Sequence, residues 1–503
     1  MTHYSQDMSA RPLSSPKPAK SRAILIAAAA LVFAAGCAVG PDYKTPAMSV
    51  PESFKEDAGW KQAAPDDGAK RGPWWEVFGD PVLNQLEEQV ENSNQTVLQA
   101  VGNYEESAQI ARSDRTGYLP TVSVNGDAAR TRSPSYQSTT TVVQPNGTSV
   151  TSSRGLTSNS FTADLQASWA PDIWGKLRRT VEADVATAQA SAADLALARL
   201  SMQATLATDY IGLRTTDDKI RLLEDAVADY TRTLRITRNK YAVGVSARSD
   251  IITAQTELDS TRAQLISSGI QRAQYEHAIA VLIGKAPSQL SIERTKTIGL
   301  TMPTVPPQLA STLLERRPDI ANAERQVKAA NARIGIQTAA YYPDLTLSAE
   351  GGFEGPKLDK LLTAPFRFWT IGANAADSLL DWGQRHDLVL SAKGAYDASA
   401  ANYRQTVLTA LQQVEDNLAG LRILKDEKQV QDAAVSEAAQ AAQIALNEYN
   451  AGTVDFTTVA AAQVTELTNR ETDLGIIQSQ LDSSVALIQA LGGGWTTSDL
   501  PRP

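Results

Sequence analysis

Hydrophobic and polar residues alternate with a period of two in four stretches of about ten residues each. The clearest stretch alternates apolar and polar side chains from Phe161 to Trp169. A period of two is that of a β-strand with one apolar face. The alternation predicts these strands: 120–130, 160–170, 344–353 and 366–378. Between the first two strands, half of residues 131–160 are Ser or Thr, and this segment is predicted to be a loop.

The period changes to that of a helix after the second strand of each pair. Residues 176–243 contain no Pro and a single Gly, Gly212, so at about 1.5 Å per residue one helix would be about 100 Å long. A second Pro-free run ends at Tyr449, and shorter helices are predicted from about Asp80 to Thr116 and from about Gln308. Apolar residues in the first long run recur at intervals of seven, as in a coiled coil: Leu206, Leu213, Ile220, Val227, Leu234 and Tyr241.

The elements occur twice in the same order. Two Tyr-x-x-Gly sequences, Tyr241 to Gly244 and Tyr449 to Gly452, lie 208 positions apart. Gly readily adopts the backbone angles found at helix ends, so each sequence predicts a tight turn between antiparallel helices. An ordinary helix C-cap is the simpler alternative for either turn taken alone. An internal duplication with helical hairpin tips near 241–250 and 449–458 explains both turns.

The duplication defines the organisation of the chain. Each repeat contains a helix, two strands and a long helical hairpin. The linker between the repeats is rich in Pro. The assigned segments are repeat 1 at 80–285, the linker at 286–307, repeat 2 at 308–492 and a C-terminal tail at 493–503.

The amino terminus has the layout of a signal peptide. Basic residues precede an apolar run of 13 residues from Ala23 to Ala35, and the only cysteine, Cys37, follows one residue later. The run is too short to cross a bilayer as a helix. Because AAGC resembles a bacterial lipobox, we predict a signal peptide at 1–36 and a lipidated arm at 37–79. Cys37 would carry a covalent diacylglycerol and an acyl chain. A plain secretory signal with a coincidental cysteine is the alternative.

The end of this arm is expected to contact the body of the protein. Trp74 and Trp75 are predicted to be packing residues. Asp80 and Pro81 then predict a helix start, with Asp80 as the N-cap and Pro81 in the first helical position.

Composition and charge exclude several classes of function. The chain has 503 residues, a formal net charge of −9, one Cys and three His. These values argue against a disulfide framework, a zinc site and nucleic acid binding, and no metal or other cofactor is expected. No nucleotide-binding loop or nucleophile elbow occurs, so an enzyme is not expected.

Four strands per chain are too few for a membrane barrel. Strands of about ten residues match the length of a tilted transmembrane β-strand. The smallest membrane barrels have about eight strands, and an open sheet in lipid leaves its edge groups without hydrogen bonds. If the strands cross a membrane, several chains must share one barrel. The alternatives are a small water-exposed sheet and a lipid-anchored periplasmic coiled-coil scaffold without a pore.

Several motifs of the chain are highly specific in combination: GCAVGPDYKTP, WWEVFGDPVL, APDIWGKLRR, RRPDIANAERQVKAANARIGIQTAAYYPDLTL and the two Tyr-x-x-Gly turns. With these motifs, the chain from Cys37 to Trp495 resembles the TolC-like outer membrane factor family, in particular its lipoprotein (NodT-type) efflux branch. The resemblance implies an α+β membrane protein that forms a homotrimer. Its 12-stranded β-barrel, with four strands per chain, would be continuous with an α-helical coiled-coil barrel.

The same resemblance implies a function, a location and partners. Such proteins are outer membrane exit ducts of tripartite efflux systems and conduct substrates passively. The implied partners are a periplasmic membrane-fusion adaptor, an inner-membrane RND-type pump and outer membrane lipid, with no nucleic acid. The implied location is the bacterial outer membrane, with a lipid anchor and a long periplasmic extension.

The resemblance also assigns roles to residues of the two turns. Asp250 matches a lumen-facing Asp of the family, Thr458 stands at the corresponding place in the second turn, and Asp455 lies nearby. These three residues are the gate candidates. The implied tip and adaptor-contact residues are Tyr241, Val243, Gly244, Val245, Tyr449, Gly452 and Thr453.

One joint between strand and helix departs from the family pattern. Trp174 and Trp382 are related by the same offset of 208. Before the second of them, the sequence Ser378 to Asp381 reads SLLD, where the family often has Pro-Leu-Phe-Asp. This joint is therefore expected to pack differently from its relatives.

Overall fold

A computed structural model describes most of the chain and divides it into two compact units. The described residues are 38–48, 54–57, 73–134, 139–143, 145, 147, 149–153, 157–295, 298–303, 316–495 and 500. The predicted signal peptide and Cys37 lie outside them. The first unit, here called the sheet unit, comprises Met1–Pro41, Asp114–Thr180 and Ala332–Leu390. The second, here called the helical unit, comprises Asp42–Ser113, Val181–Asn331 and Ser391–Pro503.

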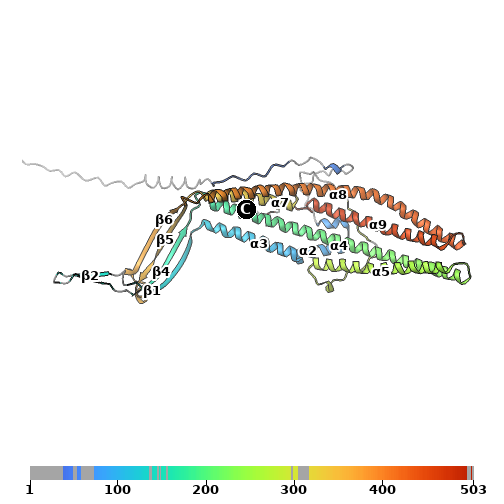
Figure 1. Ribbon diagram of the computed structural model, residues 1–503, viewed down its shortest axis with the longest axis horizontal. Helices are drawn as coiled ribbons and strands as arrows, with labels where there is room; N and C mark the ends of the chain where they lie inside the picture. Colours follow the sequence, from blue (N-terminus) through green and yellow to red (C-terminus); the bar gives the residue numbers. More distant parts are fainter. Residues whose placement is uncertain are drawn as a thin grey trace, which may run out of the picture. The chain divides into compact units, whose positions relative to one another are not determined.

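The sheet unit contains a four-stranded antiparallel sheet. Its strands are β1 (Thr121–Arg132), β4 (Thr157–Trp169), β5 (Asp344–Gly355) and β6 (Arg367–Ala376). They lie side by side in the order β1-β4-β5-β6 (Figure 1), so strands from the two halves of the sequence meet where β4 pairs with β5. β1 and β6 are the two edges of this sheet within one chain.

The register of the strands separates an apolar face from a polar face. Paired residues lie on the same side of a sheet. One row across all four strands consists of Val122, Ala167, Ala349 and Ile371. The next row, on the opposite face, consists of Ser123, Gln166, Glu350 and Thr370.

The prediction of a loop over residues 131–160 is wrong in part. β2 (Thr139–Val143) and β3 (Ser149–Ser153) pair as an antiparallel hairpin, with Val142 opposite Val150. β1 and β4 also extend into the predicted loop. Thr and Val are β-branched and favour extended backbone. The Pro-Asn-Gly sequence ending at Gly147, whose φ is 81°, is a turn signal that the Ser and Thr content obscured.

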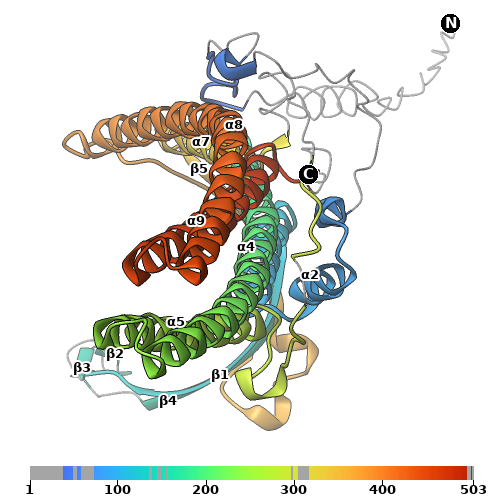
Figure 2. The ribbon, with the colours of Figure 1, turned by 90° about the vertical axis from the view of Figure 1, so that its right-hand side faces the viewer.

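The long helices of the helical unit form two hairpins. The first consists of α4 (Lys176–Ala242) and α5 (Arg248–Leu282), and the second of α8 (Gln384–Ala451) and α9 (Phe456–Ala490). Figure 2 shows α5 beside α4 and α9 beside α8. The other helices are α2 (Pro81–Ser93), α3 (Gln95–Arg115), α7 (Pro318–Ala339) and the short 3-10 helices η1 (Lys55–Asp57), η2 (Trp74–Phe78), η3 (Thr116–Tyr118), η5 (Pro287–Gln289), η7 (Leu358–Lys360) and η8 (Ala364–Phe366).

The single helix predicted from about Asp80 to Thr116 is two helices. Asn94 interrupts it with extended backbone. The Asn94 side chain accepts hydrogen bonds from the backbone N–H groups of Thr96 and Val97 at 2.9 and 3.1 Å and donates to the carbonyl of Leu282 at 2.8 Å. Asn is a good N-cap, and its buried contact with α5 stabilises a break that the apolar spacing did not reveal. The predicted start of the next repeat at Gln308 lies outside the described residues.

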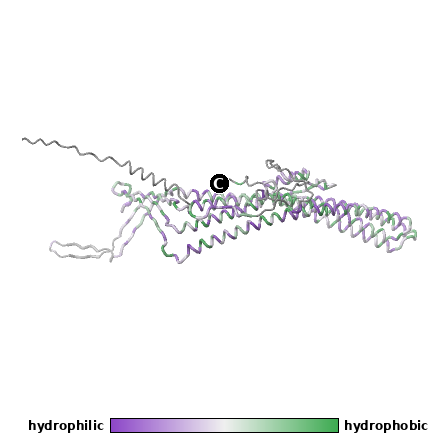
Figure 3. Tube along the Cα trace, turned by 90° about the horizontal axis from the view of Figure 1, so that it is seen from above, coloured by the Kyte–Doolittle hydropathy of each residue, from purple (hydrophilic) through white to green (hydrophobic). Residues whose placement is uncertain are grey.

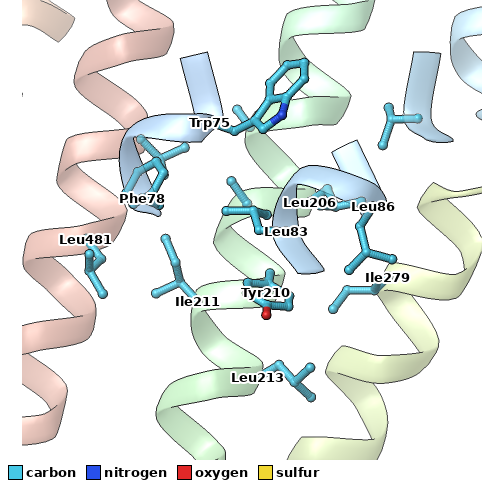
Figure 4. Close-up of a cluster of buried hydrophobic side chains, with 14 of the residues drawn as sticks. Trp75, Phe78, Leu83, Leu86, Leu206, Tyr210, Ile211, Leu213, Ile279 and Leu481 are labelled. Carbon is cyan, nitrogen blue, oxygen red and sulfur yellow. The ribbon is translucent and has the colours of Figure 1, made fainter. Parts of the chain in front are cut away.

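A large apolar core holds the first hairpin to α2. Leu83, Leu206 and Tyr210 are buried in it (Figure 4). Trp74 and Trp75 are buried in the same cluster, which confirms them as packing residues. The predicted cap of α2 is also confirmed: the Asp80 carboxylate accepts from the N–H of Val82 at 2.7 Å and from the Tyr210 hydroxyl at 2.7 Å.

The predicted seven-residue seam ends before the tip of the first hairpin. Leu206 and Leu213 are fully buried and Leu234 is nearly so, but the Tyr241 side chain is 45% exposed. The spacing alone could not show where along α4 the burial ends.

Polar and apolar residues are mixed along the long helices (Figure 3). Among the described residues, none of the helices carries an apolar stretch that could cross a membrane.

Candidate functional site

The candidate site is the pair of turns at which the two helical hairpins end. In the first turn, α4 ends at Ala242 and Gly244 has a left-handed φ of 78°. The N–H of Gly244 donates to the carbonyl of Tyr241 and the N–H of Val245 to the carbonyl of Lys240, both at 2.9 Å. These two bonds define a Schellman motif, which requires positive φ at the Gly position.

The second turn has the same backbone geometry. Gly452 has a φ of 79°. Its N–H donates to the carbonyl of Tyr449 at 3.1 Å, and the N–H of Thr453 donates to the carbonyl of Glu448 at 3.0 Å. The repeated Tyr-x-x-Gly sequence therefore forms one turn geometry twice.

The helices that follow the turns are capped in two different ways. In the first hairpin, Ala247 is the N-cap residue and Asp250, three residues later, accepts from the N–H of Ala247 at 3.1 Å. In the second, Asp455 is the N-cap residue and accepts from the N–H of Thr458 at 3.1 Å. A capping box contains both bonds. Each tip of this chain has one of them.

The two tyrosines of the duplicated sequence have different surroundings. Tyr241 is 45% exposed, whereas Tyr449 is 4% exposed. Tyr449 meets Phe456 edge to face, with ring centroids 5.5 Å apart and an interplanar angle of 68°. Phe456 is fully buried, and the position corresponding to it in the first hairpin is Arg248. The second tip therefore has an aromatic core that the first tip lacks.

Both hairpins contribute to the buried cluster next to the tips, here called the tip cluster. It contains residues of α4, α5, α8 and α9: Tyr230, Leu234, Ala254, Leu258, Ala445, Tyr449, Phe456, Val459 and Ala460. The Tyr230 hydroxyl donates to the carbonyl of Gln463 at 3.1 Å, and the Gln463 amide donates to Thr233 at 3.3 Å. Burial raises the pKa of Tyr230 further above its ordinary range, which disfavours loss of the hydroxyl proton.

A polar contact joins the two turns. The Lys240 ammonium donates to the carbonyl of Tyr449 and lies 3.9 Å from the centroid of the Tyr449 ring. The Ser246 hydroxyl lies 3.3 Å from the Tyr449 hydroxyl and donates to the Asp250 carboxylate at 2.6 Å. A chain of polar contacts thus runs from Asp250 in the first turn, through Ser246, to Tyr449 in the second.

The structure places the gate candidates in unlike positions. Asp250 is half-buried and bonded within its own turn and through Ser246. Asp455 is exposed, and the hydroxyls of Thr457 and Thr458, together with the N–H of Thr458, lower the pKa of its carboxyl. The Thr458 hydroxyl donates to Asp455 at 2.9 Å. Asp455 and Thr458 therefore act together as a cap, while Asp250 belongs to the contact between turns.

The tip residues assigned to partner contact are mainly solvent-exposed. Val243 and Val245 are 75% and 67% exposed and form an apolar end to the first tip. Gly244, Gly452 and Thr453 are also exposed. Tyr449 differs from this set, because its ring is buried in the tip cluster.

Sequence reasoning did not single out Lys240, Ser246 or Phe456. Lys240 and Ser246 flank the motif, but no local pattern indicates that they reach the other hairpin. Phe456 could have been found, since it is the first residue after the Asp455 cap and is apolar, whereas the corresponding residue of the first repeat is Arg248. In the part of the chain that the structure describes, His, Cys, Asp and Glu side chains form no group suited to hold a metal ion.

The polar face of the sheet is a second candidate functional feature. The Asn125 amide donates to Asp164 at 3.1 Å and to Gln166 at 3.4 Å, so adjacent strands are linked by side chains as well as by backbone. On the other face, Val124, Trp369 and Ile371 are largely exposed. Exposed apolar side chains gathered on one face of a sheet mark a surface that contacts protein or lipid.

Comparison with known proteins places these features in context. Residues 86–285 and 309–493 match the sequence model of the outer membrane efflux protein family. The chain is 28% identical over 481 residues to the probable efflux pump outer membrane protein TtgC of Pseudomonas putida, covering 94% of this chain and 96% of that protein. It is 27% identical over 454 residues to the pyoverdine export outer membrane protein OpmQ of Pseudomonas putida, covering 88% and 93% of the two chains.

A solved structure shows the same fold. The outer-membrane channel OprN superimposes with a TM-score of 0.83 at 26% sequence identity, over 91% of this chain and all of that one.

Proposed function

This chain belongs to the outer membrane efflux protein family, and we propose that it is the exit duct of a tripartite pump, closed at its helical tips. It is an outer membrane efflux channel and part of an efflux system. The proposal adds the number of chains, the gate, the lipid anchor and the classes of partner. The observation that carries it is the two-faced sheet, which has an apolar row, a polar row and two edges without a partner strand in one chain.

The unpaired edges support a barrel shared by several chains. In lipid, each unpaired backbone group at an edge costs several kcal/mol, and pairing β6 of one chain with β1 of the next removes both edges. Three copies would give 12 strands, a number within the range of membrane barrels. The row with Val122 and Ile371 would then face lipid, and the row with Gln166 and Glu350 would line water.

The contact between the turns supports a gate at the tips. Lys240 and Ser246 hold the second tip to the first through Tyr449, and the tip cluster packs beneath them. Opening would require the hairpins to separate, which breaks these few contacts without unfolding either helix. The exposed Val243 and Val245 offer an apolar surface to the helical hairpins of a membrane-fusion adaptor, with an RND-type pump in the inner membrane as the energy source.

The start of the described chain supports an anchor at Cys37. The N–H of Val39 donates to the carbonyl of Trp174 at 3.2 Å, and Arg179 donates to the carbonyl of Val39 at 3.3 Å. These bonds fix the backbone directly after Cys37 to the sheet unit. Acyl chains on Cys37 would therefore start from a fixed point of this unit. Mass spectrometry of the mature protein tests the anchor, since Cys37→Ser should leave an unprocessed precursor without lipid.

Ion conductance of the purified protein in planar bilayers tests the channel. We expect long-lived single-channel currents whose cation selectivity falls in Asp250→Ala, because this change removes a carboxylate from the tip region. Asp359→Ala, in η7 of the sheet unit, is the matched control that removes one carboxylate elsewhere. Stable insertion of oligomers without current would favour the alternative function, a lipid-anchored scaffold without a pore.

A further inference from the structure

The segment between β6 and α8 exposes three large apolar side chains close together. Leu379 and Trp382 are each 93% exposed and Leu380 is 78% exposed. Trp382 also has a left-handed φ of 54°, which is rare for a bulky residue. Isolated exposed side chains need no explanation, but such a cluster marks an interaction surface.

The corresponding Trp of the first repeat shows what such a side chain contacts. Trp174 stacks on Tyr342, with ring centroids 4.7 Å apart and an interplanar angle of 21°. Its indole N–H donates to the carbonyl of Pro343 at 2.9 Å. Lys176 pairs with Asp344 at 3.6 Å in the same place. The turn after β4 therefore packs on the turn before β5, because β4 and β5 are neighbouring strands.

Among the described residues, Trp382 of the second repeat has no comparable contact, since its side chain is 93% exposed. Trp382 follows β6, which is an edge strand, and the only other edge is β1. The turn before β1, Tyr118-Leu119-Pro120, corresponds to Tyr341-Tyr342-Pro343 before β5. Its Leu119 side chain is 67% exposed. One chain thus carries both surfaces of such a contact, Trp382 and Leu119, at opposite edges of its sheet, where they cannot meet each other.

We propose that Trp382 of one copy of this chain packs on Leu119 and Pro120 of the next copy. This inference rests on the proposed shared barrel and adds to it the side-chain contact that sets the junction. The two surfaces are different, so the contact is head-to-tail, and in the proposed barrel of three copies it closes into a ring. The Trp382 indole N–H would donate to the carbonyl of Pro120, as Trp174 does to Pro343. Gln384 and Thr121 would stand where Lys176 and Asp344 pair.

Cross-linking with a short bis-maleimide tests this contact in the purified, detergent-solubilised protein. The double variant Leu119→Cys/Trp382→Cys should give covalent dimers and higher oligomers on a denaturing gel. The matched control, Tyr342→Cys/Trp174→Cys, contains the equivalent pair within one chain and should cross-link without an increase in chain number. Cys37 is present in every variant, so the variants with Leu119→Cys alone or Trp382→Cys alone measure the background and should give no higher oligomers.

The outcomes separate this inference from the proposed function. If light scattering shows oligomers but the Leu119 and Trp382 variant stays monomeric on the gel, the joint is wrong and the shared barrel stands. If the unmodified protein is monomeric in detergent and in lipid, both fail. As a second measurement, Trp382→Ala should lower the temperature at which oligomers dissociate by several degrees. An unchanged dissociation temperature would contradict the contact.

Discussion

The two hairpin tips of this chain share a backbone and differ in almost every side chain that surrounds it. Both end in a Schellman turn at a Gly with φ near 78°. On either side of the Gly, Lys240 corresponds to Glu448, Ser246 to Val454 and Arg248 to Phe456. The first tip is open and polar at these positions, whereas the second packs Tyr449 and Phe456 into the tip cluster.

The difference assigns separate tasks to the two copies. Gln463 is buried and bonds Thr233 of the first hairpin, whereas its counterpart Gln255 is bonded by Arg238 of its own hairpin at 2.8 Å. A side chain of the second hairpin thus bonds the first hairpin, whereas the matching side chain of the first hairpin is bonded within its own hairpin. Both turns have Gly at the position of positive φ, which Gly adopts at little cost, whereas the side chains around the Gly differ.

The largest effect should come from removing the aromatic core of the second tip. Phe456→Ala deletes a fully buried ring, a change that costs about 3–5 kcal/mol in protein cores. Amide hydrogen exchange in residues 445–460 should accelerate strongly, and tips without this packing should leak ions in planar bilayers. The first tip should change less, because it has no aromatic core of its own.

Val243→Ala is the control for this prediction. Val243 is 75% exposed, so its truncation should alter stability by no more than about 0.5 kcal/mol. Equal acceleration of exchange in both variants would show that the tips do not differ in packing.

A smaller loss is expected when the bridge between the tips is cut. Lys240→Ala removes a donor to the Tyr449 carbonyl and a cation–π contact, together worth about 1–3 kcal/mol. Because the bridge links the hairpins, conductance of the closed channel should rise while the helices remain folded by circular dichroism.

Arg238→Ala is the matched control for the bridge. Arg238 carries the same charge close by, but it bonds Gln255 within the first hairpin. If both variants raise the conductance equally, the effect comes from charge at the tip and not from the contact between hairpins.

Much of the fold could be predicted from local pattern. Period-two alternation located β1, β4, β5 and β6, because each strand has one apolar face. The Tyr-x-x-Gly sequences located both turns, because Schellman geometry is a local property of the backbone. Asn94 was missed because an N-cap in mid-helix is recognised only by its contact with Leu282, which lies far away in the sequence.

The candidate site was less predictable for the same reason. Tyr241 and Tyr449 occupy the same position of the Tyr-x-x-Gly motif, yet one ring is exposed and the other is buried. The difference arises from Phe456 and from packing between hairpins that are about 200 residues apart. A sequence pattern within one repeat therefore cannot show which of the two tyrosine rings is buried against the other hairpin.

Replacing each of the two tyrosines by Phe compares the tips directly, and the expected effect on the stability of the second tip is modest. Tyr449→Phe removes a hydroxyl that lies 3.3 Å from the Ser246 hydroxyl, a bond worth about 0.5–1 kcal/mol. Tyr241→Phe alters an exposed side chain and should be neutral. Exchange at the second tip should increase only in Tyr449→Phe. A similar increase in Tyr241→Phe would mean that the exposed hydroxyl has a partner in the assembled channel.

The smallest effect should be a dependence on pH confined to the second tip. Hydroxyl and N–H donors from Thr457 and Thr458 lower the pKa of Asp455. A lowered pKa means that the carboxylate stabilises the cap above its ordinary value of about 3.9 and that this stabilisation is lost as the pH falls through the lowered pKa. Protection factors of residues 456–458 should therefore be constant near neutral pH and decrease below about pH 4. In Asp455→Asn the side chain does not titrate, so the decrease should disappear. The same decrease in that variant would assign the pH dependence to another group.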